Sequence, residues 1–214
     1  MTIHANRGKD FEEWVEQANS VYNNKNLAII TKIPTPWKVQ RNYTPYNKYQ
    51  ITRAFPEKKS TVDFGGTASN FSIWFDVKAT TNKTSFPLAN IHKHQVEYLE
   101  KVAQQGGLGF FLIHSRLNKK TWLLWIDQLV KYRDESGRKS IPFAWFEENC
   151  EEVKQGRGVM LDYLPIILRR NQWENGAMSF GRQSFLQLWF MLLKPWPNLF
   201  TQSWRRFSSE RVVI

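Results

Sequence analysis

The chain has 214 residues, which is enough for one compact domain with a hydrophobic core. Hydrophobic residues at 42% and aromatic residues at 15% exclude a largely disordered chain. The formal net charge of +11 indicates a polyanionic partner, although a solvated basic surface would give the same number. Cys150 is the only cysteine, so an internal disulfide is excluded.

The sequence favours neither a secretory signal nor a membrane span. Its first residues lack the apolar core of a signal peptide, and no run of about 18 apolar residues occurs. The longest apolar patch, residues 185–193, is interrupted by Gln187. We therefore expect a soluble, cytoplasmic protein.

The first elements are a helix and a short strand, followed by a basic segment. Apolar residues at helical spacing predict a helix over 10–22, and residues 27–30 predict a buried strand that ends before Pro34. Residues 31–59 carry seven basic residues against one acid, with five aromatic residues interleaved. Its prolines and weak periodicity favour an exposed arm or insertion over a piece of core.

The middle of the chain predicts an α/β unit. Residues 71–78 alternate as a strand, and residues 92–104 have helical periodicity. Residues 106–114 and 121–126 predict two further strands, and the first is continuously apolar, which is typical of a central strand. A strand, a helix and a strand in succession indicate an α/β fold.

The last third of the chain divides at about residue 168. Residues 138–150 predict a short capped helix, and residues 158–167 a closing strand or extended segment. Residues 169–214 carry seven basic residues, two acids and four of the ten tryptophans. This tail predicts an amphipathic appendage that docks on the body or touches nucleic acid, an extension of little consequence, or a membrane-surface segment.

The candidate chemistry lies in residues 60–80, STVDFGGTASNFSIWFDVKAT. Side chains alternate along a strand, so Asp76 and Lys78 share one face and Thr61 and Asp63 share another. We expect a turn through GGTASN at 65–70 that brings Asp63 close to Asp76.

Two neighbouring carboxylates repel each other unless a cation lies between them. A divalent ion such as Mg²⁺ tolerates a site of few carboxylates, and a nearby lysine can stabilise charge on a phosphate. Gln95, early in the predicted helix, offers a further neutral oxygen. An ion pair of Lys78 with either aspartate is an equally good interpretation of the spacing. Glu12 is a third carboxylate, although a solvent-facing position suits it as well.

Thr-Val-Asp at 61–63 followed by Asp-Val-Lys at 76–78 resembles the PD-(D/E)XK nuclease core. Further blocks, in this order, resemble the RecU family of Holliday junction resolvases over residues 4–168: NRGKDFEEWVEQAN, AIITKIPTP, KTSFPLANIHKHQ, GGLGFFLI, GRKSIP and LDYLPII. The resemblance implies a restriction-endonuclease-like mixed β-sheet flanked by helices, with a protruding basic stalk over residues 37–59. Asp76 stands where this family usually has Glu.

The same resemblance implies the site residues. Mg²⁺, with Mn²⁺ as a substitute, would be bound by Thr61, Asp63, Asp76 and Gln95. Lys78 would stabilise the transition state, and Glu12 would lie beside the site. Contacts with DNA would come from basic residues in the first two blocks, the stalk and the loop after the second acid: Arg7, Lys32, Lys38, Arg41, Lys48, Arg53 and Lys83.

The resemblance predicts a nuclease domain over residues 1–168, followed by a tail of unknown role over 169–214. The expected enzyme is a homodimer that nicks four-way DNA junctions symmetrically in recombination and repair, with a recombinase or branch-migration protein as a partner. Two alternatives stay open at this point. One is a related nuclease with another DNA substrate, and the other is a junction-binding protein without catalysis.

Overall fold

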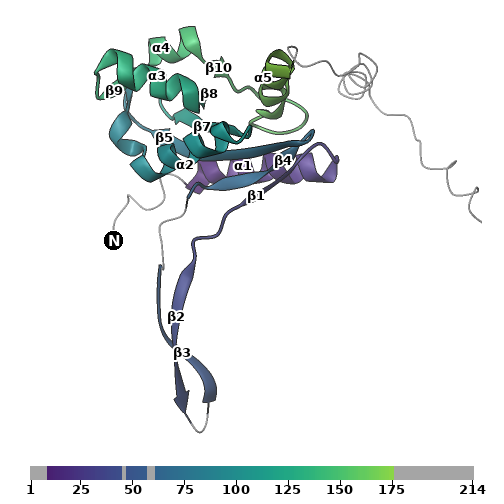
Figure 1. Ribbon diagram of the computed structural model, residues 1–214, viewed down its shortest axis with the longest axis vertical. Coiled ribbons are helices and arrows are strands. Elements are labelled where there is room, and N and C mark those ends of the chain that lie inside the picture. The colour runs from purple at the N-terminus through teal and green to yellow at the C-terminus, as the bar shows by residue number, and fades with distance from the viewer. Residues whose placement is uncertain (1–8, 45–46, 57–60, 176–214) are drawn as a thin grey trace, which may run out of the picture. The chain divides into compact units, whose positions relative to one another are not determined.

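The computed structural model describes residues 9–44, 47–56 and 61–175 (Figure 1). Side chains are described for residues 10–40, 53–55 and 61–170. The chain divides into two units, Met1–Gln172 and Trp173–Ile214, and nearly all described residues belong to the first. The predicted tail therefore lies largely outside the described residues, as does Arg7.

A six-stranded mixed sheet forms the centre of the first unit, in the order β1-β4-β5-β7-β8-β10. Among these strands β5 and β7 pair in parallel, and the other neighbours pair antiparallel. The bounds are Ile29–Lys32 for β1, Phe64–Ala68 for β4, Phe71–Thr80 for β5, Leu108–Ser115 for β7, Lys120–Trp125 for β8 and Glu151–Glu152 for β10. The short strands β6 (Ser85–Pro87) and β9 (Ser140–Pro142) form a separate pair.

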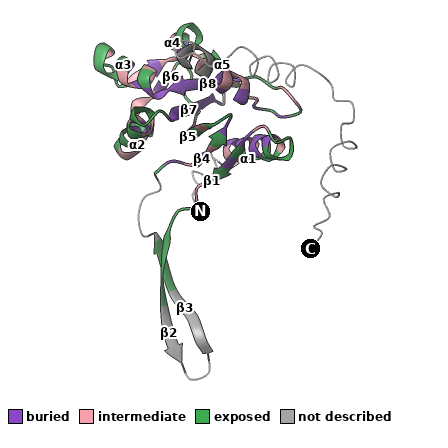
Figure 2. Cartoon of the chain, turned by 45° about the vertical axis from the view of Figure 1, so that its right-hand side comes forward, coloured by how far each residue is buried: buried purple, intermediate pink, exposed green. Residues whose placement is uncertain are grey.

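Helices cover both faces of the sheet, and each face has its own hydrophobic core. The first core takes the apolar faces of α1 (Lys9–Asn24) and α5 (Leu164–Asn175). The second takes α2 (Lys93–Gln104), α3 (Ile126–Ser136) and α4 (Phe143–Asn149), and a 3₁₀ turn, Leu88–Asn90, precedes α2. Figure 2 shows the buried residues gathered along β7 and β8 between these layers.

Strand β7 explains why residues 106–114 are continuously apolar. Phe110 and Leu112 belong to the first core, whereas Phe111 and Ile113 belong to the second. Alternate side chains of one strand point to opposite faces, so a strand covered on both sides needs apolar residues at every position. The expected mixed sheet flanked by helices, with this strand at its centre, is confirmed.

The predicted turn through residues 65–70 is wrong in its position. Gly65 and Gly66 lie inside β4, and the turn consists of Ser69 and Asn70, with φ of 48° and 71°. A Cβ on Gly66 would lie 2.0 Å from the carbonyl oxygen of Ile29 on β1. The glycine therefore allows two strands to approach closely, while two consecutive residues with positive φ form the tight hairpin turn.

Two other predicted strands differ from the structure. Residues 27–30 were expected as a buried strand, but β1 spans Ile29–Lys32 at the sheet's edge with only Ile30 buried. Residues 158–167, expected as a closing strand or extended segment, form a loop that enters α5 at Leu164. Its place is fixed by α1, because the Tyr22 hydroxyl donates to Asp162 at 2.9 Å. The apolar residues of this segment pack on α1 and the sheet without joining a ladder.

The predicted arm is a β-hairpin, formed by β2 (Trp37–Thr44) and β3 (Asn47–Pro56). It is a two-stranded sheet of its own, separate from the six-stranded sheet (Figure 1). Trp37 pairs with Pro56 and Lys38 with Phe55, and both aromatic side chains are exposed. An isolated hairpin has no core in which to bury such residues, which leaves them available for a ligand.

None of the described helices combines the length and the apolar character needed to cross a bilayer.

His114 is a buried polar residue on β7, at the boundary between the sheet and α1. Its ring stacks on Phe11 with 4.9 Å between centroids, and Nδ1 lies 2.9 Å from the Thr121 hydroxyl oxygen. Burial, with a smaller contribution from the charge of Arg116, lowers the pKa of this imidazole below its ordinary value of 6.5.

Because the folded protein favours neutral His114, its contribution to stability is complete above about pH 6.5 and is lost as the pH falls below that value. We predict that the free energy of unfolding decreases from pH 7 to pH 5 more steeply in the wild type than in His114→Gln. The difference in slope cannot exceed about 1.4 kcal/mol per pH unit for one proton. Urea unfolding at several pH values measures it, and parallel pH profiles would contradict the prediction.

Candidate active site

The β4–β5 hairpin sets the two predicted acids opposite each other. Asp63 immediately precedes β4, and the pairing of Phe64 with Phe75 places it beside Asp76 on β5. The backbone N–H of Val77 donates to Asp63 Oδ2 at 3.2 Å, and the carbonyl of Asp63 accepts from the N–H of Ile33 at 2.8 Å. The position of Asp63 is thus fixed by the strands on both of its sides.

Asp76 and Lys78 lie on the face of β5 that α2 covers. Ile73, Phe75 and Val77 alternate with them and belong to the opposite core, as the strand periodicity predicted. Lys78 Nζ lies 2.6 Å from Asp76 Oδ1, and the two side chains are 17% and 0% exposed. The ion pair expected from the spacing is therefore present.

Gln95 approaches the acids from the first turn of α2. Its Nε2 donates a hydrogen bond to Asp76 Oδ2, and its Oε1 accepts from the backbone N–H of His92 at 3.2 Å. Gln95 is 6% exposed. Gln95 was expected to offer an amide oxygen to a metal, and in this structure the atom that faces Asp76 is the amide nitrogen.

Burial dominates the electrostatics of the pair. It raises the pKa of Asp76 to about 7, with the repulsion of Asp63 as the second cause and Lys78 opposing both. Burial also raises the pKa of Asp63, against the Val77 N–H and Lys78, which lower it. One lysine does not compensate a buried and a half-buried carboxylate, so an additional positive charge would be favourable at this site.

Glu12 and Lys32 lie at the side of the site formed by α1 and β1. The charge of Glu12 contributes to the raised pKa of Asp63, which places this carboxylate within electrostatic reach. Lys32 Nζ lies 2.8 Å from Glu12 and 2.7 Å from Glu16, and both partners raise its pKa. Lys32, predicted as a DNA contact, therefore has its charge balanced by two acids in this structure.

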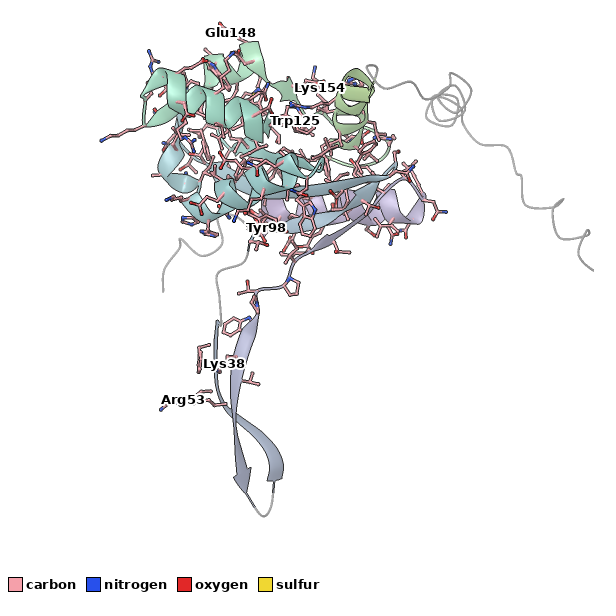
Figure 3. The ribbon with its side chains drawn as sticks, viewed as in Figure 1. Lys38, Arg53, Tyr98, Trp125, Glu148 and Lys154 are labelled. Carbon is pink, nitrogen blue, oxygen red and sulfur yellow. The ribbon has the colours of Figure 1, made fainter. Side chains whose placement is uncertain are left out.

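Most of the remaining predicted residues are exposed at the surface of the described part of the chain. Thr61 is exposed and lines a surface hollow of about 550 Å³ with residues of α2, among them Lys93, His94 and Tyr98. Lys83 is exposed in the loop after β5. Figure 3 shows Lys38 and Arg53 on the hairpin, and both are exposed. The side chains of Arg41 and Lys48 fall outside the described set.

A hard divalent cation fits this donor set. The described residues contain no group of three or more His, Cys, Asp or Glu side chains placed to hold a metal. The candidate ligands are the two carboxylates, which lie opposite each other with one lysine to balance both charges. Mg²⁺ retains several waters and is commonly held by one or two carboxylates, so two neighbouring carboxylates suit it.

Sequence reasoning missed the backbone groups that orient the acids. The N–H groups of Val77 and His92 position Asp63 and Gln95 respectively. A main-chain donor leaves no signature in the residue type, so no pattern could have found them. The side chain of His92 itself is exposed.

Two carboxylates and a lysine on adjoining strands of a mixed sheet are the arrangement expected of a nuclease core. Comparison with known families agrees with this class. Residues 6–169 match the family described as Recombination protein U. The chain therefore belongs to the RecU family.

Similar curated proteins carry the name Holliday junction resolvase RecU. That of Streptococcus pneumoniae serotype 19F (strain G54) is 35% identical over 165 residues, covering 76% of this chain and 83% of the relative. That of Streptococcus pneumoniae (strain CGSP14) is 34% identical over the same length. A solved structure of Archaeoglobus fulgidus Hjc, a Holliday junction resolvase, is also similar, with 11% identity and a TM-score of 0.34. The match covers 64% of this chain and 84% of the Hjc chain.

Because the folded protein holds a proton on Asp76 more tightly than the unfolded chain, its ionisation costs stability as the pH rises from about 4 to 7. We predict that Asp76→Asn, which retains an acceptor for Gln95, is more stable than the wild type at pH 8 in a chelating buffer. The expected gain is about 1–3 kcal/mol and disappears near pH 4. Chemical unfolding at both pH values measures it. An Asp76→Asn variant less stable than the wild type at pH 8 would contradict the raised pKa of Asp76.

Proposed function

We propose that this chain is a Mg²⁺-dependent endonuclease that resolves Holliday junctions by symmetric nicking in recombination and DNA repair. The observation that carries the proposal is the juxtaposition of Asp63, Asp76 and Lys78 in a member of the RecU family. Relatives of similar length and 35% identity are named as resolvases. A protein that only bound junctions would have no need to hold two carboxylates side by side at a place where a DNA phosphate would bind.

Asp63 and Asp76 would hold the ion, with Mn²⁺ as a substitute for Mg²⁺. Thr61 and Gln95 are the other ligands that the family resemblance implies, and Gln95 already contacts Asp76 through its amide. When bound, such an ion supplies Lewis-acid stabilisation of the phosphate and lowers the pKa of a water molecule. It would also relieve the repulsion that raises the pKa of Asp76.

The chain's own residues would orient and stabilise the scissile phosphate. Lys78 Nζ, mostly buried and held beside Asp76, would offer a positive charge to the oxygens on which negative charge develops. The N–H of Val77 fixes one oxygen of Asp63 and so orients the carboxylate. Because these groups are already fixed by strand pairing, little reorganisation would be needed when substrate binds.

The β2–β3 hairpin would provide the contact with the junction. Lys38 and Arg53 are exposed for phosphate contacts, and the exposed rings of Trp37 and Phe55 are suited to stacking on unpaired bases. Two copies of the chain, related by a twofold axis, would set two sites on opposing strands of a four-way junction. A recombinase or branch-migration protein would be a partner in the cytoplasm.

We predict that Asp63→Asn lowers cleavage of a synthetic four-way junction by at least about a hundredfold and leaves junction binding within about twofold, because Asn keeps the shape but removes a charged ligand. The symmetry of the nicks, with and without Mg²⁺, is read on a sequencing gel. Asp134→Asn, an exposed acid on α3, is the matched control. Cleavage at the wild-type rate by Asp63→Asn would refute the metal assignment.

We predict that removing two hairpin cations, with Lys38→Ala and Arg53→Ala together, weakens junction binding and reduces its salt slope by about 2 units. Removal of two exposed cations elsewhere, with Lys131→Ala and Lys139→Ala, is the control for net charge. Fluorescence anisotropy at several salt concentrations measures both. An equal loss in both double variants would favour a nuclease that recognises DNA through net charge, with no special role for the hairpin.

A further inference from the structure

A surface hollow on α2 lies beside the acidic pair. Its volume is about 550 Å³, and its lining consists of Thr61, Lys93, His94, Glu97, Tyr98 and Lys101. Thr61 precedes Asp63 by two residues, and His94 directly precedes Gln95, which contacts Asp76. This α2 hollow therefore borders the acids both through the chain that enters β4 and through the first turn of α2.

One face of α2 forms most of the hollow. Lys93, Glu97 and Lys101 follow each other at intervals of four residues, which places them in a row along the helix. The face turned to the sheet carries Val96 and Leu99, which are buried in the second core. At a rise of 1.5 Å per residue the two lysines lie about 12 Å apart along the axis. Phosphates of one DNA strand follow each other at about 3.4 Å along a duplex, so the row is long enough to meet neighbouring phosphates.

The two lysines of the row differ in how their charges are balanced. Lys101 is exposed, and no acid pairs with its side chain in the described part of the chain. Lys93 Nζ lies 3.4 Å from Glu97 Oε1, and these side chains are 90% and 52% exposed. An ion pair this exposed contributes little free energy, so a phosphate can take the place of Glu97 at Lys93. The hollow thus offers one unpaired cation and one weakly paired cation to an anionic ligand.

Tyr98 contributes an aromatic ring to the same hollow (Figure 3). The ring is half-buried and meets Trp74 of β5 edge-on, with 5.6 Å between centroids and 74° between the planes. Trp74 in turn covers Gly65 on the paired strand β4, where a Cβ would lie 2.6 Å from the indole. The missing side chain at Gly65 gives room to Trp74, and Trp74 holds the ring of Tyr98 in place.

Strand β5 determines how far Tyr98 lies from the acids. Trp74 and Asp76 are alternate residues of this strand, so they share one face and lie roughly 7 Å apart along it. Because Tyr98 packs on Trp74, its ring lies next to Asp76 on that face. A DNA strand with one phosphate at the acids would bring a neighbouring nucleotide to this ring.

We propose that the α2 hollow is a nucleotide-binding subsite: Tyr98 stacks on the nucleobase next to the scissile phosphate, and Lys101 binds a phosphate of the same strand. The inference deepens the proposed function and rests on it for the place of the cut. Proteins hold unpaired nucleotides by combining an aromatic ring with nearby cations, because every nucleobase can stack and every phosphate is charged. The volume of the hollow lies within the range of sites for small ligands.

Photo-crosslinking tests the stacking contact. Synthetic four-way junctions carry 5-iododeoxyuridine at one position at a time around the crossover, and each is irradiated with the full chain in a chelating buffer. We expect a nucleotide that flanks the cut to crosslink to Tyr98, as located by mass spectrometry of the peptides. Tyr98→Phe should retain the crosslink, and Tyr98→Leu should reduce its yield by about tenfold or more. No crosslink to Tyr98 from any position would overturn the proposal.

Lys101→Ala tests the phosphate contact at an exposed position, where the substitution leaves the packing of the core unchanged. We expect the salt slope of junction binding to fall by about 1 unit. Lys131→Ala, an exposed lysine on α3, is the matched control and should leave the slope unchanged. Equal slopes in the wild type and both variants would overturn the proposal. A smaller slope in Lys101→Ala without a crosslink to Tyr98 would show a phosphate contact alone, which also overturns the subsite.

Cleavage of the same junctions with Mg²⁺ separates this inference from the proposed function. If the wild type binds junctions and cuts none, the proposed function fails, while a crosslink to Tyr98 still supports the subsite. If the wild type cuts junctions and the crosslinked nucleotide lies away from the cut, the proposed function stands and the subsite beside the scissile phosphate is overturned.

Discussion

Two carboxylates held side by side, one buried and one half-buried, with one lysine to compensate them, are the constraint on which this molecule depends. Burial raises the pKa of both acids, and the repulsion of Asp63 adds to the shift of Asp76. Such a pair stays in place only because favourable interactions in the surrounding structure outweigh its free-energy cost. The β4–β5 register, the parallel pairing of β5 with β7 and the two apolar cores supply them. The acidic pair lowers the free energy of unfolding, and the packing and pairing of the surrounding sheet raise it.

The parts of the fold that depend on periodicity were predictable from the sequence. Alternation along β5 placed Asp76 and Lys78 on one face, and the continuous apolar run identified β7 as central. The positions of the glycines were not predictable in the same way. Gly66 looked like a turn residue, but it allows the close approach of Ile29 from a strand far away in the sequence. A contact between distant strands has no local signature.

The site was predictable in its acids and lysine and only partly in its supporting groups. Lys32 looked like a free cation for DNA, yet Glu12 and Glu16 come to it from α1. Gln95 was identified as an amide near the acids, but its orientation depends on a main-chain N–H at position 92. Residue types report what a side chain can do, and the fold determines which of its atoms faces a partner.

The acidic pair joins two regions of the sheet that differ in how easily they open. Asp76 lies within β5, which is paired with a strand on each side. Asp63 precedes β4, and its carbonyl accepts a hydrogen bond from Ile33, the residue that follows the edge strand β1. Edge strands fray at a lower free energy than central ones. A partial opening that releases β1 and the start of β4 would separate the two carboxylates while the rest of the sheet stays folded. The side of the site that holds Asp63, next to β1, would therefore open at a lower free energy than the side that holds Asp76.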